Sequence, residues 1–79
     1  MNYQYFFTDK RGNHLGFTQV YDKCLLNQLN DKYVRQTALF QFCNKYKLDS
    51  DNVEIRLESI TRSKDACKVL KFEFTKVGI

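Results

Sequence analysis

Hydrophobic and polar positions alternate in the first part of this chain, as they do in a β-strand. Tyr3, Tyr5 and Phe7 fall on one face of a strand, and the even-numbered positions Gln4, Phe6 and Thr8 fall on the other. Residues 8–13 then read as a turn containing Gly12 and Asn13. A second strand is predicted over His14–Tyr21, with Leu15, Phe17 and Tyr21 on one side. The two segments together predict a β-hairpin.

The last third of the chain shows the same alternation. Val53–Ile60 places Val53, Ile55 and Leu57 on one face and charged residues on the other. Residues 61–65 predict a second turn. Cys67–Val77 is predicted as the final strand, with three inward side chains: Leu70, Phe72 and Phe74.

The middle of the chain has a helical period in two parts. After a capping Asp22, Leu25, Leu26 and Leu29 share one side of a helix. The second stripe consists of Val34, Ala38, Leu39, Phe42, Cys43 and Tyr46. In one straight helix the two stripes would lie roughly opposite each other, and a single sheet could not bury both. We therefore expect a break near Asn30, with Asn30 as the new N-cap.

These patterns predict one α+β domain covering residues 1–79. Its sheet has four mainly antiparallel strands in the order ββ-α(α)-ββ. A central helix, preceded by a short one, packs on one face of that sheet. No internal repeat or linker divides the chain.

A second stripe of side chains on the central helix is not needed for this core. Tyr33 and Phe40 are seven residues apart and align with Thr37 and Asn44 on the face opposite Val34 and Phe42. Two interpretations stay open. Leu25–Leu29 folds back over the stripe, or the stripe is exposed and binds a protein partner or a second copy of the chain.

The charge balance brings in a different class of partner. The formal net charge is +4, and basic residues occur at both predicted hairpin tips: Lys10, Arg11, Arg62 and Lys64. With a helix break at Asn30 we expect both tips at one end of the sheet, where they would form one phosphate-binding patch. Aromatic residues on a sheet are typical of proteins that bind single-stranded nucleic acid. The RNP1 motif is absent, however, and Asp9 and Asp65 dilute the patch.

The remaining motifs indicate no catalytic or metal chemistry. The chain has one histidine, His14, and three widely spaced cysteines, Cys24, Cys43 and Cys67, which we expect to be reduced and mostly buried. Residues 49–60 begin like a calcium loop, but Glu54 and Ile60 stand where glycine and glutamate are required. The RGNHLG segment lacks the lysine of a P-loop, and Gly16 in it predicts a bulge or a close packing contact. We expect no enzyme activity, no cofactor, no metal and no membrane span.

The sequence therefore favours a small, non-enzymatic, cytoplasmic interaction protein that binds and modulates or inhibits a protein partner. The absence of Pro and Trp beside many Asn, Lys, Tyr and Phe residues indicates AT-rich coding, as in a phage or another mobile element. The alternative is an RNA or single-stranded DNA binding module that uses the basic hairpin tips.

Overall fold

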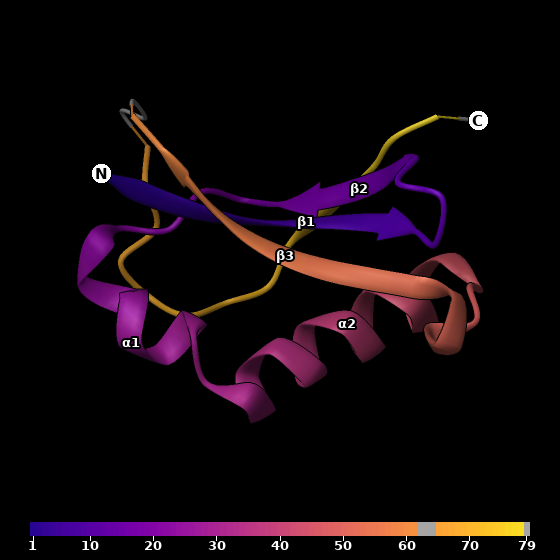
Figure 1. The fold of residues 1–79 in the computed structure, drawn as a ribbon. Helices are drawn as coiled ribbons and strands as arrows, with labels where there is room; N and C mark the ends of the chain where they lie inside the picture. Colours follow the sequence, from indigo (N-terminus) through magenta and orange to yellow (C-terminus); the bar gives the residue numbers. More distant parts are fainter. Residues whose placement is uncertain (62–64, 79) are drawn as a thin grey trace.

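The computed structural model describes residues 1–61 and 65–78 and shows an α+β fold in two layers (Figure 1). The strands are β1 (Asn2–Asp9), β2 (His14–Thr18), β3 (Val53–Ile60) and β4 (Phe74–Lys76). The helices are α1 (Leu26–Leu29) and α2 (Lys32–Tyr46), with single turns of 3-10 helix at Lys23–Leu25 and Ser50–Asn52. Both α-helices lie on the same side of the sheet (Figure 1). The predicted fold class is confirmed.

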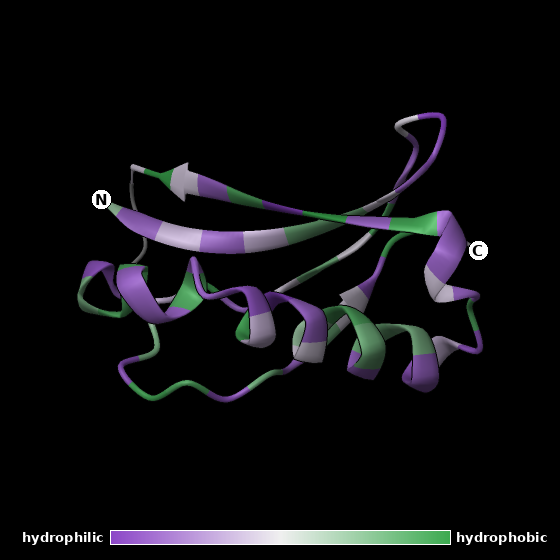
Figure 2. Ribbon diagram, turned by 60° about the horizontal axis from the view of Figure 1, so that its bottom comes forward, coloured by the Kyte–Doolittle hydropathy of each residue, from purple (hydrophilic) through white to green (hydrophobic). Residues whose placement is uncertain are grey.

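The sheet has the strand order β3-β1-β2-β4, and all three strand pairs are antiparallel. β1 and β3 pair along their whole length, from Asn2 opposite Ile60 to Asp9 opposite Val53. The predicted bounds of β3 are correct, and the alternation of polar and apolar residues along it is visible in Figure 2. The long edge of the sheet is therefore β3, and the short edge is β4.

A bulge in the β1–β2 hairpin changes which side chains face the core. Phe7 pairs with Gly16 and Thr8 pairs with His14, so Leu15 is an extra residue in β2. Phe17 pairs with Phe6 on the face opposite the helices. The prediction that Leu15, Phe17 and Tyr21 share one side is wrong for Phe17. Gly16 lies opposite Phe7 on the helix side of the sheet, so its neighbour Phe17 points to the other face.

The helical region breaks where the two stripes predicted it. Asn30 ends α1, and Asp31 has an extended backbone, with φ −64° and ψ 134°. The N-cap of α2 is Asp31 and not Asn30, since the Asp31 carboxylate accepts hydrogen bonds from the backbone N–H groups of Tyr33 and Val34. This redirection buries both Leu29 and Ala38, which a straight helix could not do.

The core between the layers is rich in aromatic rings. Phe7 of β1 stacks on Phe42 of α2 with ring centroids 4.0 Å apart and planes 4° apart, and Phe74 meets both rings edge-on. Tyr5 is fully buried and its hydroxyl donates a hydrogen bond to the carbonyl of Leu29. Burial raises the pKa of Tyr5 to about 12, so this hydroxyl stays protonated at neutral pH.

The predicted last strand is much shorter in the structure. Only Phe74–Lys76 forms a strand, whereas residues 67–73 cross the helix side of the sheet beside α1 as irregular chain (Figure 1). Leu70, Phe72 and Phe74 do pack against the core, as predicted. The backbone of this segment is bound by Tyr21, whose hydroxyl donates to the Lys71 carbonyl 2.8 Å away, and by the Gln19 N–H, which donates to the Glu73 carbonyl.

Candidate functional site

The side of α2 that faces away from the sheet carries an exposed apolar stripe. Tyr33 is 77% exposed and Phe40 is 51% exposed, and Thr37 and Asn44 beside them are exposed as well. We call these four residues the outer face of α2. It exists because Ala38, Phe42 and Cys43 occupy the opposite side of the same helix, where the core needs them.

The leucines before the break do not cover this outer face. Leu29 is fully buried, and its own carbonyl accepts the hydrogen bond from the Tyr5 hydroxyl. Leu25 packs against the same core. Of the two interpretations of the stripe, exposure is the one that the structure bears out.

The outer face of α2 is uncharged. The hydroxyl of Thr37 donates to the Tyr33 carbonyl at 2.8 Å, so it is already satisfied within the helix. Asn44 retains an amide side chain that can donate and accept. Two aromatic rings beside uncharged polar groups match the centre of a protein–protein interface, where charged residues are depleted and tyrosine is enriched.

Of the basic residues predicted to form one patch, Lys10 and Arg11 lie in the described part of the chain. Lys10 is in the turn after β1, where its ammonium lies 3.8 Å from the Glu54 carboxylate, and Arg11 follows it. Arg62 and Lys64 lie outside the described residues. The chain leaves β3 at Ile60, which pairs with Asn2, at the opposite end of the sheet from Asp9.

The expectation of one shared end is therefore wrong for the strand ends that lead into the two tips, since Asp9 ends β1 at one end of the sheet and Ile60 ends β3 at the other. It assumed that the segment before the break would cross the sheet. α1 has only four residues, so α2 alone makes the crossing and the chain enters β3 beside the first turn.

The open face of the sheet carries an aromatic pair that the sequence pattern did not place correctly. Phe6 and Phe17 lie side by side with ring centroids 6.3 Å apart, and His14 lies 6.4 Å from Phe6. Pairing across the strands puts Arg56 on one side of this pair and Thr75 on the other. The bulge at Leu15 is the feature that would have corrected the prediction.

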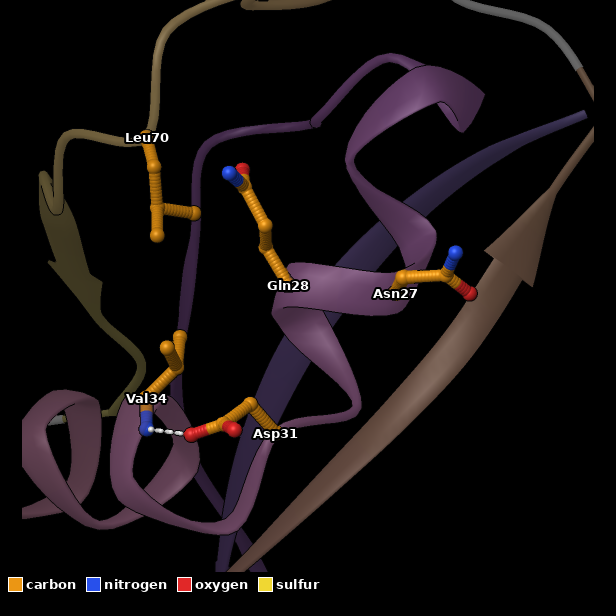
Figure 3. Close-up of a pocket in the computed structure, with 5 residues that line it drawn as sticks. All are labelled: Asn27, Gln28, Asp31, Val34 and Leu70. Atoms are coloured by element: carbon orange, nitrogen blue, oxygen red, sulfur yellow. Dashed lines mark hydrogen bonds between the residues drawn. The ribbon is translucent and has the colours of Figure 1, made fainter.

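A small groove lies where α1, α2 and the irregular segment meet. It has a volume of about 370 Å³ and is lined by Asn27, Gln28, Asp31, Val34 and Leu70. Figure 3 shows Val34 and Leu70 pointing toward one another, with the Asp31 carboxylate bonded to the Val34 N–H. The lining contains no nucleophile, and its one carboxylate is engaged as a helix cap, so this groove offers contacts and not reactive groups.

The cysteines and the histidine are dispersed. Cys43 is buried, which raises its pKa, but Cys24 is exposed and Cys67 is half-buried, so the expectation of mostly buried thiols is wrong. The Cys67 thiol lies 2.8 Å from the Val69 carbonyl. Within residues 1–61 and 65–78, no three His, Cys, Asp or Glu side chains converge as metal ligands would.

No protein family matches the chain, and no match was found among curated proteins or solved structures.

None of the helices in the described part of the chain is both long and apolar enough to span a membrane.

Proposed function

We propose that this protein is a non-enzymatic interaction protein that binds another protein through the outer face of α2 and thereby modulates or inhibits it. The observation that carries the proposal is the exposure of Tyr33 and Phe40 on a helix whose opposite side is fully used by the core. The role suits a cytoplasmic protein of a phage or another mobile element, the origin that the composition favours.

The physical basis is the cost of leaving these rings in water. Fully burying an aromatic side chain contributes about 1.5–3 kcal/mol, and tyrosine can also donate a hydrogen bond at an interface rim. A helix that is held rigidly at its other face loses little further entropy when a partner binds. The partner we expect is a protein with an apolar groove or helix that accepts the two rings.

The test is a capture experiment with the intact chain and the double variant Y33A/F40A. A partner retained from a nuclease-treated bacterial lysate by the wild-type protein should bind the variant at least about 30-fold more weakly. Binding to the purified partner is measured by isothermal titration calorimetry. Circular dichroism should show an unchanged fold, because neither side chain belongs to the core.

The matched control is V69A, which removes part of a strongly exposed apolar side chain that does not belong to α2. This variant should retain wild-type affinity. Equal affinity of Y33A/F40A and V69A would show that the outer face of α2 is not the binding site.

A second candidate function is favoured by the open face of the sheet. Phe6 and Phe17 lie on adjacent central strands, an arrangement on which bases of single-stranded RNA or DNA can stack. Arg56 lies opposite Phe6 on β3, and Lys10 and Arg11 follow the end of β1. Glu54 and Glu58 share this region and pair with Lys10 and Arg56, which weakens its attraction for phosphate.

Fluorescence anisotropy with mixed single-stranded oligonucleotides separates the two candidates. A nucleic-acid binder should bind at micromolar concentrations, lose affinity steeply between about 50 and 200 mM salt, and be unaffected by Y33A/F40A on the opposite side of the molecule. Absence of binding at about 100 µM protein in low salt would remove this candidate.

A further inference from the structure

The outer edge of β3 is the longest unpaired backbone edge in the described part of the chain. All eight residues of β3 pair with β1 on one side. Within residues 1–61 and 65–78, no strand pairs with the other side. An exposed strand edge presents unpaired N–H and C=O groups that can extend the sheet with another strand.

Two features that often protect an edge strand, proline and a β-bulge, are missing from β3. The chain contains no proline, and the β1–β3 register runs without a bulge from one end to the other. The other edge strand, β4, has only three residues and is protected by its shortness. On the helix side of β3, Ile55 and Leu57 are only half-buried, so they retain apolar surface for a neighbouring strand.

We propose that β3 pairs antiparallel with β3 of a second copy of this chain, with the two-fold axis at Leu57. This interface is independent of the outer face of α2 and goes beyond the proposed function. In this register Arg56 lies opposite Glu58 of the second copy, and Glu58 lies opposite its Arg56. Both α2 helices are then on the same side of one continuous eight-stranded sheet.

The charges on β3 select this register among those of comparable length. The Arg56 and Glu58 side chains point the same way, lie 3.6 Å apart in one strand and are about half exposed. An axis at Arg56 would place Arg56 against Arg56 and Glu54 against Glu58. An axis between Arg56 and Leu57 would set side chains that point to opposite faces of the sheet against each other, whereas directly opposite residues of an antiparallel pair point to the same face.

One further register is also complementary in charge. An axis at Ile55 pairs Glu54 with Arg56, but it uses only Val53–Leu57 and forms a shorter ladder. The axis at Leu57 uses 54–60 and leaves Glu54 free to keep its pair with Lys10. Opposite charges facing each other stabilise a strand pair and like charges destabilise it.

A charge-exchange experiment tests the proposal. Sedimentation equilibrium should show a dimer for the wild-type protein, and R56E and E58R should each raise its dissociation constant about tenfold or more. The double variant R56E/E58R restores both cross-strand pairs in exchanged order and should dimerise like the wild type. Both side chains are exposed, so the variants should fold, as circular dichroism can verify.

The other outcomes overturn the proposal. A wild-type protein that is monomeric up to about 1 mM, or a dimer unaffected by either single variant, excludes pairing in this register. An effect of R56E without an effect of E58R assigns the axis to Ile55. If Y33A/F40A abolishes the dimer while R56E and E58R leave it intact, the copies meet through α2 instead. Slow hydrogen exchange at the β3 edge only in the presence of a different protein assigns that edge to a foreign strand.

Discussion

Gly16 lies where the sheet and α2 approach each other closely. A Cβ atom added there would lie 2.5 Å from Phe42 Cε1 and 2.5 Å from the backbone oxygen of Thr75. Phe42 is fully buried and stacked on Phe7, and the Thr75 oxygen belongs to β4, so neither can easily move aside. We predict that G16A lowers the free energy of unfolding by about 3 kcal/mol, measured by urea denaturation.

Gly12 provides the matched comparison. Its backbone has φ 87°, and an added Cβ would meet no atom within 4 Å. G12A should therefore cost only about 1 kcal/mol, from the left-handed backbone alone. Similar losses for the two variants would mean that Gly16 is required for its backbone and not for the close contact with Phe42.

At the scale of elements, the sequence was sufficient to predict a strand or helix where the buried side chains and the backbone pairing follow the same period. β3 alternates cleanly, and its predicted bounds match the structure. The helix break was predictable because the stripes containing Leu29 and Ala38 differ in phase. Its N-cap was misplaced by one residue because Asn30 and Asp31 are both good caps, and only the backbone of Asp31 is extended.

The predicted final strand shows that an alternation of buried and exposed side chains does not by itself establish a β-strand. Leu70, Phe72 and Phe74 alternate inward as predicted, yet only Phe74–Lys76 has a strand partner. Periodicity records which side chains are buried, whereas a strand also requires a neighbouring backbone. An irregular segment lying across a core produces the same alternation.

The residues of the candidate site were predictable from the sequence, but whether their side chains are exposed or covered was not. The spacing of Tyr33 and Phe40 identified a second helix face. Whether Leu25–Leu29 covers that face depends on the path of the chain through Asp31, which spacing does not encode. The aromatic pair Phe6 and Phe17 was missed because a bulge reverses the face of one strand without changing its composition.

At the scale of the whole molecule, the segment that follows β3 contributes side chains to the core between the sheet and the helices. α2 covers part of the helix side of the sheet, and residues 67–73 cover the part beside α1. Phe72 is the anchor of this segment, since its ring lies 6.3 Å from that of Tyr5 and 6.4 Å from that of Tyr21. The C-terminal region is therefore part of the single core and not an appendage to it.

F72A should accordingly destabilise the entire molecule, by about 2 kcal/mol, because it opens a cavity beside two fully buried tyrosines. Hydrogen exchange followed by NMR should show that the slowest amides of β1 and β3 lose protection by the same amount as those of β4. The control V69A lies on the same segment but is 70% exposed and should change stability by less than about 0.5 kcal/mol. Loss of protection confined to residues after 65, with β1 and β3 unchanged, would show that the segment detaches independently and that the core of the sheet and α2 is complete without it.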